Sequence, residues 1–235
     1  MIYRLLPLLV GVFFCDMKRK VAIQGIGGCN HYIAAKLFFK GDKVDTIDCD
    51  TFKELVGHIV EDPSKLGVMA IENTIAGSLL QNYKLLKEND IVIVGEYKLR
   101  IKHALVAMPG VEVGDIKEIN THPMAFMQCQ EYLDTLPNVK LVEKEDTAGS
   151  AKWIKDNNLK DHAAICPAGV AALYGMNVLA DGIETNKRNF IPRLQTFCNC
   201  FKDSINCQLR ISLRQAGLFC YRSNQFGFIH VYFLL

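Results

Sequence analysis

Four segments of the sequence carry hydroxyl, amide and glycine residues that could bind a small anion: Gly25–Asn30, Asn73–Ser78, Thr121–Pro123 and Asp146–Ser150. Each segment follows a short apolar run and precedes a stretch with helical periodicity. The start of a helix exposes free backbone N–H groups, which favour negative charge. One such turn alone is equally suited to capping its helix. Four of them together predict a pocket rich in hydrogen-bond donors and suited to a carboxylate-bearing ligand.

Other chemistries fit these segments less well. The first turn begins like a dinucleotide-binding loop, but Asn30 stands where the third glycine belongs, and the acidic residue expected later could be Asp48 or Asp50. No Gly-Lys-Ser/Thr phosphate loop follows it. No His, Glu and Asp set has the spacing of metal ligands, and no Ser or Cys occupies a nucleophile elbow. We therefore expect neither a cofactor nor a metal, and keep a dinucleotide site as the weaker alternative.

The elements that must position these turns alternate between strand and helix from Lys20 to Phe190. This alternation predicts parallel βαβ units, hence an α/β fold with helices on both faces of its sheets. The expected strands are Val21–Gln24, Val44–Ile47, Gly67–Ile71, Ile91–Gly95, Ile101–Ala107, Ile116–Thr121, Val139–Val142 and Ala163–Cys166. The expected helices are Ala34–Phe39, a Thr51-capped helix to Val60, one after Ser78 to Lys87, one from Pro123 to before Pro137, Thr147–Asn157 and Pro167–Tyr174.

Composition sets the broad class. The 235 residues are 50% hydrophobic and 22% charged, with a formal net charge of +2. This balance argues against a disordered chain and against a nucleic-acid binder that relies on a basic body. No stretch reaches the roughly 18 apolar residues of a membrane-spanning helix, so we expect no membrane partner. The apolar run Leu5–Cys15 is short and followed by charges, so residues 1–17 are predicted to be a dispensable extension of a cytoplasmic protein instead of an export signal.

The last part of the chain differs from the rest. Residues 191–235 hold four of the nine cysteines and five Lys or Arg residues but only one acidic residue, Asp203. Neither helical spacing nor strand alternation persists there, and the cysteine spacings match no paired zinc motif. We interpret this segment as an atypical tail with unpaired thiols.

The ordered set of turns resembles the prephenate dehydratase family. The resemblance rests on Gln24–Gly28, Ile71–Ser78, Gly95-Glu96 with Leu99–His103, Thr121–Ala125 with Gln128-Cys129, and Asp146–Ala151 with Tyr174-Gly175. It covers residues 18–190 in family order. The family converts prephenate to phenylpyruvate with loss of water and carbon dioxide, in phenylalanine biosynthesis and without a cofactor.

The resemblance also implies an architecture. We expect a two-lobed fold like that of periplasmic binding proteins, with the active site between the lobes. Lobe 1 would span about 18–96 and lobe 2 about 97–182, with a return to lobe 1 from about 183. The family further implies a homodimer and a small-molecule substrate, prephenate.

Carried over residue by residue, the resemblance assigns roles. The residues expected to take part in catalysis are Glu72, Asn73, Thr121 and Gln128. Those expected to bind substrate are Gly28, Thr74, Gly77, Ser78, His122, Thr147, Gly149, Ser150 and Arg193. For most of them helix capping is the competing interpretation, and for Gln128 it is an ordinary solvated position.

One departure from the family is serious. The family carries a Thr-Arg-Phe motif whose threonine is the leading candidate for the proton donor, but here Phe190 is followed by Ile191, Pro192 and Arg193. Arg193 could stand in for the arginine after one extra residue, whereas Pro192 offers no hydroxyl. Two hypotheses follow: a prephenate dehydratase whose activity is impaired, or a non-catalytic carboxylate-binding protein of the same fold. The abrupt change beyond residue 190 also suggests a shifted reading frame.

Overall fold

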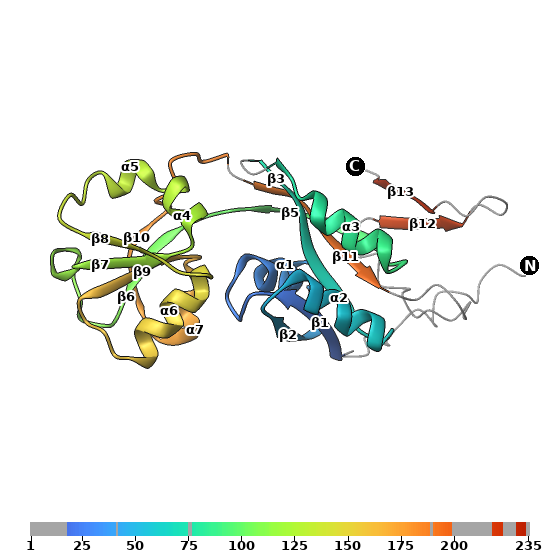
Figure 1. Ribbon diagram of the computed structural model, residues 1–235, viewed down its shortest axis with the longest axis horizontal. Coiled ribbons are helices and arrows are strands. Elements are labelled where there is room, and N and C mark those ends of the chain that lie inside the picture. Colours follow the sequence, from blue (N-terminus) through green and yellow to red (C-terminus); the bar gives the residue numbers. More distant parts are fainter. Residues whose placement is uncertain are drawn as a thin grey trace, which may run out of the picture.

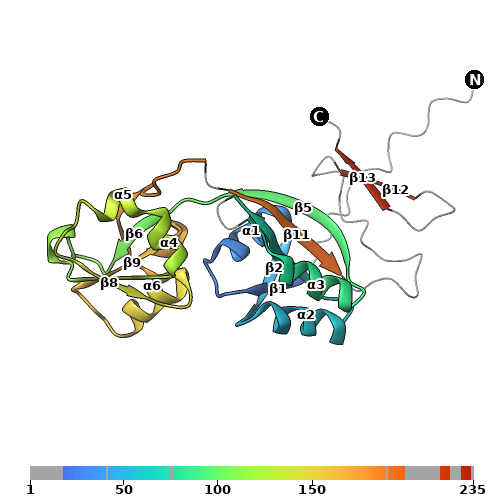
Figure 2. The same cartoon turned by 45° about the horizontal axis from the view of Figure 1, so that its top comes forward.

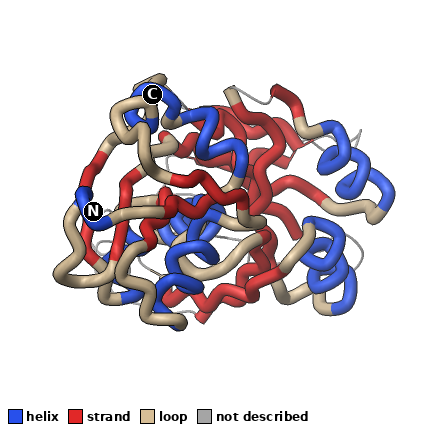
Figure 3. The backbone as a smooth tube through the Cα atoms, turned by 60° about the vertical axis from the view of Figure 1, so that its left-hand side comes forward, coloured by secondary structure: helices blue, strands red, loops and turns tan. Residues whose placement is uncertain are grey.

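The computed structural model describes residues 18–40, 42–74, 77–188, 190–198, 218–222 and 229–233. The chain forms two lobes, each built on its own β-sheet, joined by two extended crossovers (Figure 1). Helices lie outside the strands in both lobes (Figure 3). The two-lobed α/β architecture expected from the sequence is confirmed. Among the described residues, none of the helices is both long and apolar enough to cross a membrane.

Lobe 1 contains a six-stranded sheet with three helices packed against it. Strands β2, β1 and β3 run parallel, and β11 lies antiparallel between β3 and β5. The elements of this lobe are β1 (Lys18–Gln24), α1 (Asn30–Phe38), β2 (Lys43–Cys49), α2 (Phe52–Glu61), β3 (Leu66–Asn73), β4 (Gly77–Ser78), α3 (Leu80–Glu88), β5 (Val92–Arg100) and β11 (Phe190–Cys198).

Lobe 2 contains a five-stranded sheet in the order β10-β6-β9-β7-β8. Strand β7 is parallel to both β8 and β9, whereas β6 is antiparallel to β9 and β10. Its elements are β6 (Ala104–Ala107), η1 (Val113–Asp115), β7 (Glu118–Thr121), α4 (Pro123–Gln128), α5 (Gln130–Leu133), β8 (Lys140–Glu143), α6 (Thr147–Asp156), β9 (His162–Cys166), α7 (Gly169–Tyr174) and β10 (Asn177–Asp181). Beyond the lobes, β12 (Leu218–Arg222) pairs antiparallel with β13 (Ile229–Phe233).

The two crossovers between the lobes run side by side (Figure 2). The first follows β5, and the second precedes β11. Two hydrogen bonds connect them: Ile183 N donates to His103 O over 3.0 Å, and His103 N donates to the Glu184 carboxylate oxygen Oε2 over 3.1 Å. Glu184 is nearly fully buried at this junction. The position of one lobe against the other is therefore coupled to a small set of buried hydrogen bonds.

The structure differs from the predicted elements in several places. The helix expected from Pro123 is divided into α4 and α5, and β10 was not expected. Helix α1 begins at Asn30 instead of Ala34, because the thiol of Cys29 accepts from Tyr32 N and caps it. Strand β5 continues to Arg100, and β6 begins only at Ala104. The regular structure of lobe 1 also runs past residue 190: β11 extends to Cys198, although its sequence lacks strand alternation. Hydrogen bonds to neighbours on both sides and the burial of Thr196 and Phe197 impose the strand.

Candidate active site

All four of the turns singled out in the sequence meet at one cavity between the lobes. Its volume is about 200 Å³, which restricts it to a small ligand. Lobe 1 contributes the ends of β1 and β3, and lobe 2 contributes the starts of α4 and α6. The lining residues are Gln24, Cys29, Asn30, His31, Asn73, Ile101, His103, His122, Met124, Ala125, Gln128, Glu145, Asp146, Thr147 and Ile191.

Helix N-termini give the cavity its electrostatic character. Cys29, His122 and Asp146 are the N-cap residues of α1, α4 and α6, and all three line the cavity. The first turn of each helix therefore starts at the cavity wall, and the dipoles of its peptide groups favour an anion there. Because α1 belongs to lobe 1 and α6 to lobe 2, a ligand with two carboxylates could engage both lobes.

The side chain of Asp146 has a structural role at the start of helix α6. Its Oδ1 accepts from Gly149 N over 2.5 Å, which caps helix α6. Burial raises the pKa of Asp146, and hydrogen bonds from backbone N–H groups at the start of α6 act in the opposite direction. Its Oδ2 faces lobe 1: a Cβ built on Gly25 would lie 3.3 Å from this oxygen. The glycine at this turn, with φ of +95°, thus permits a close approach of the two lobes.

The first turn, Gly25–Asn30, packs tightly on lobe 2. Tyr174 donates its hydroxyl hydrogen to Gly27 O over 2.9 Å. A Cβ on Gly28 would lie 2.8 Å from Val170 Cγ2, closer than real atoms come. The glycines of the first turn therefore serve the contact between the lobes. This packing explains the glycine content that made the segment look like a dinucleotide-binding loop.

Gln128 is held in a buried hydrogen-bonded arrangement. Its Oε1 lies 2.6 Å from His103 Nε2, and its backbone oxygen accepts from Thr185 N. An amide oxygen can only accept, so the proton of His103 lies on Nε2. Burial lowers the pKa of His103, which keeps the imidazole neutral. This bond fixes the orientation of the Gln128 amide, whose NH₂ group remains as a donor at the cavity.

Two other histidines line the cavity with different partners. His31 Nε2 accepts from Ala70 N over 3.2 Å, and burial lowers the pKa of His31 to about 4. This imidazole is therefore neutral and committed to the lobe 1 sheet. His122 Nδ1 accepts from Met124 N over 3.1 Å, which places the proton of the neutral ring on Nε2. His122 thus has an N–H group that can donate to a ligand.

The residues expected to form the site separate into two groups. The structure brings Asn73, Gln128, His122 and Thr147 together at the cavity. Thr121 and Ser150 do not line the cavity: Thr121 is buried and donates its hydroxyl to Ile165 O over 2.6 Å, and the Ser150 hydroxyl donates to Asp146 O. The structure places the remaining expected residues outside the cavity lining: Gly28, Glu72, Thr74, Gly77, Ser78 and Gly149. The side chain of Arg193 lies outside the described residues.

Several lining residues were not expected from the sequence. His31 directly follows the first turn, and His103 ends the segment Leu99–His103 that carries the resemblance, but neither was assigned a role in the site. Asp146 and Asn30 lay inside the singled-out turns, so their position was the available signal. Ile191 reaches the cavity only because β11 returns to lobe 1 next to β5.

The position that departs from the family motif lies at an irregularity of β11. Ile191 pairs with Leu99 and Leu194 pairs with Tyr97, so β11 has one more residue than β5 between these two pairs. The additional residue belongs to the segment Pro192-Arg193. A proline inside a sheet is tolerated at such a bulge, where one ladder hydrogen bond is already missing.

Comparisons with known proteins agree with this geometry. Residues 21–191 match the family model described as prephenate dehydratase. The chain is 36% identical over 171 residues to arogenate dehydratase 1 of Petunia hybrida, covering 72% of this chain and 40% of that protein. It is also 36% identical over 171 residues to arogenate dehydratase/prephenate dehydratase 6 of Arabidopsis thaliana, covering 72% and 41%. The chain thus spans about two fifths of the length of these relatives.

The fold has solved counterparts. The crystal structure of a prephenate dehydratase from Arthrobacter aurescens in complex with L-Phe superimposes with a TM-score of 0.71 at 24% identity. That superposition covers 86% of this chain and 74% of the other. At this level of identity the likeness concerns the two-lobed fold, which is the feature that brings the four turns together.

Proposed function

This chain belongs to the prephenate dehydratase family, and on that premise we propose that it converts prephenate to phenylpyruvate with loss of water and carbon dioxide. The observation that carries the proposal is the convergence of Asn73, His122, Gln128 and Thr147, from both lobes, on one cavity. Such a site can hold a dianion by fixed hydrogen bonds and helix dipoles. The reaction then needs little more than positioning and a proton.

The bond changes define what the residues must do. The C–C bond to the ring carboxylate breaks and releases carbon dioxide. Its electron pair completes the aromatic ring, and the C–O bond to the ring hydroxyl breaks as that oxygen takes up a proton and leaves as water. Aromatisation supplies a large driving force, so the protein must mainly orient the dianion and assist departure of the hydroxyl.

We assign binding of the carboxylates to the donors at the helix starts and to the amides. Asn73, at the end of β3, and Gln128, in α4, come from opposite lobes, so a bound dianion would bridge them. The Nε2–H group of His122 is proposed to hydrogen-bond the departing hydroxyl, partly in place of the threonine hydroxyl missing at Pro192. Thr121 is less suited to this role, because its hydroxyl is committed to Ile165 O.

The test is turnover by the full chain. Phenylpyruvate formed from prephenate is followed by its ultraviolet absorbance, and phenylalanine formed from arogenate is measured in parallel by amino-acid analysis. The two substrates differ by a keto against an amino group, and relatives carry both activities in their names. A larger kcat/KM with prephenate is expected. A larger value with arogenate would keep the dehydratase reaction and change its substrate.

A second candidate is a non-catalytic protein that binds a small dicarboxylate in the same cavity. Pro192 favours it, because the family's proton donor is absent at that position. Calorimetric titration with prephenate in the same preparations distinguishes the two. Binding of prephenate without product from either substrate would establish the binding protein and overturn the enzyme.

Assembly and location belong to the same proposal. We expect a homodimer, as the family resemblance implies, and a cytoplasmic location, as the interpretation of residues 1–17 as a dispensable extension suggests. Light scattering of the purified full chain tests the first expectation, and fractionation of the source cells tests the second.

A further inference from the structure

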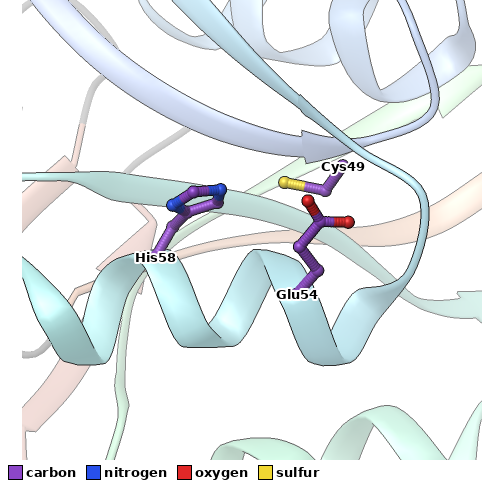
Figure 4. Close-up of side chains that lie close together, drawn as sticks. All are labelled: Cys49, Glu54 and His58. Carbon is purple, nitrogen blue, oxygen red and sulfur yellow. The ribbon is translucent and has the colours of Figure 1, made fainter.

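Three side chains of different chemistry converge on a face of lobe 1 that is separate from the cavity. Cys49 is the last residue of β2, and Glu54 and His58 lie one turn apart on α2. Residues spaced by four on a helix share a face, and this face of α2 is turned toward the end of β2. Figure 4 shows the thiol, the carboxylate and the imidazole pointing toward one another. None of the three lines the interlobe cavity.

The distances between the three side chains are compatible with binding of one metal ion by all of them. One potential ligand atom from each residue lies within 4.8 Å of the other two. In a tetrahedral zinc site with bonds of about 2.0–2.3 Å, neighbouring ligand atoms are roughly 3.3–3.8 Å apart. Each pair therefore needs to close by roughly 1.5 Å at most. Glu54 is exposed and His58 is half-buried, so small rotations of their side chains can supply this change.

The hydrogen-bonding state of the cluster also indicates a missing partner. His58 Nδ1 is buried, and in the part of the chain that the structure describes it has no hydrogen-bond partner. A buried nitrogen in this state costs free energy unless something binds it. Glu54 Oε2 accepts from Asp50 N over 2.8 Å, and Thr51 Oγ1 accepts from Glu54 N. The bond from Asp50 N restrains one oxygen of the Glu54 carboxylate, as outer hydrogen bonds do for metal ligands.

We propose that Cys49, Glu54 and His58 bind one Zn²⁺ ion, with the fourth position open to water. The set of sulfur, nitrogen and one carboxylate oxygen is characteristic of zinc, whereas Mg²⁺ and Ca²⁺ prefer oxygen ligands throughout. On binding, the Cys49 thiol releases its proton to solvent and the S–H bond is replaced by a Zn–S bond.

The consequence of binding is structural. Zn²⁺ would join the end of β2 to the first two turns of α2. The backbone oxygen of Cys49 accepts from Gly25 N over 2.9 Å, so the ion would also restrain the turn that packs on lobe 2. Because the ion binds the folded state, it should raise the Tm of the full chain by several degrees at saturating metal.

The test uses the full chain after removal of metals with a chelator. Co²⁺ serves as the spectroscopic probe, because a Co²⁺–thiolate bond gives a near-ultraviolet charge-transfer band. We expect this band, its displacement by Zn²⁺, and calorimetric binding of one Zn²⁺ per chain. Cys49→Ser should abolish the band, and His58→Gln should weaken Zn²⁺ binding by at least about tenfold.

Control variants distinguish Zn²⁺ binding at this cluster from Zn²⁺ binding elsewhere on the chain. Glu61→Gln lies on the same helix and outside the cluster, so it should leave Zn²⁺ affinity unchanged. Combined serine replacement of Cys198, Cys200, Cys207 and Cys220 should leave the band intact. If Cys49→Ser does not fold, as judged by circular dichroism, His58→Gln and Glu54→Gln on the helix surface decide the question. The proposal is overturned if the full chain binds no Zn²⁺, if the band survives in folded Cys49→Ser, or if Zn²⁺ affinity is unchanged in His58→Gln and Glu54→Gln.

Discussion

His103 Nε2 lies 2.6 Å from Gln128 Oε1, a contact that joins the first interlobe crossover to helix α4. The same His103 receives Glu184 of the second crossover on its backbone N–H. One residue thus links both crossovers to an amide at the cavity. His103 is for this reason proposed to position Gln128 instead of contacting the substrate's reacting atoms.

Replacing His103 with leucine should therefore lower kcat/KM by removing the bond that orients the Gln128 amide. The loss of one such hydrogen bond corresponds to about 1 kcal/mol, or roughly a fivefold fall. Gln128→Leu should give a larger fall, and the double variant should be no worse than Gln128→Leu alone. Additive effects in steady-state kinetics with prephenate would show that His103 acts independently of Gln128.

Asn73→Ala should weaken turnover without unfolding the protein. Asn73 ends β3 at the cavity, where its amide can donate to a carboxylate. Loss of one hydrogen bond to a charged group costs about 1.5–3 kcal/mol, or roughly 10- to 150-fold in kcat/KM. Asn177→Ala, at an exposed strand position of lobe 2 outside the cavity, is the matched control and should behave as wild type. Unchanged kinetics in folded Asn73→Ala would remove this residue from the site.

Replacing Ile191-Pro192 with a single threonine should raise turnover. The replacement removes the additional residue of β11 and restores a hydroxyl at the position where the family carries its proton donor. Positioned acid catalysis is worth about 10²–10⁴ in rate. A single valine in the same place is the control, since it restores the register and the shape but not the hydroxyl. Equal rates for the threonine and valine variants would mean that the register matters and that another group supplies the proton.

Gly28→Ala should destabilise the folded chain through the contact between the lobes. The new Cβ would lie 2.8 Å from Val170 Cγ2, and φ is +97°, so both a clash and backbone strain are introduced. Together they should cost about 2–4 kcal/mol in urea unfolding. Gly77→Ala has a similar positive φ but no atom within 4 Å of the new Cβ, and it isolates the backbone contribution. Equal losses in the two variants would contradict a role for Gly28 in lobe packing.

The lowered pKa of buried His31 predicts how the stability of the folded chain depends on pH. Its pKa is about 4 in the folded chain, below the usual 6.5, because burial disfavours the charged ring. Between these values the unfolded chain binds a proton that the folded chain does not, so stability falls as the pH drops from about 7 to 4. Over this pH range the protonation of His31 in the unfolded chain lowers the free energy of unfolding by about 3 kcal/mol. Urea unfolding at several pH values should show a shallower slope for His31→Gln, and identical slopes would exclude this histidine as a source.

The order of elements and the identity of the family follow from the sequence alone. Apolar runs and helical periods are local, so residues 18–190 predict an α/β fold, and four turns predict the walls of one pocket. The two-lobed arrangement was implied by the family resemblance. The turns were recognisable because the start of a helix next to an anion restricts the residue types over a few positions. The contribution of Asn73, His122 and Thr147 to the cavity follows from their places in those turns.

Only the tertiary structure relates residues that are far apart in the chain. The bond from His103 to Gln128, the packing of Gly28 on Val170 and the continuation of β11 to Cys198 depend on how the lobes dock and on which strands become neighbours. The cluster of Cys49, Glu54 and His58 escaped the search for metal spacings because one ligand ends a strand while the other two lie on a helix. Local patterns encode elements, whereas buried polar partners are selected by three-dimensional packing, in which a group without a local partner must find a distant one.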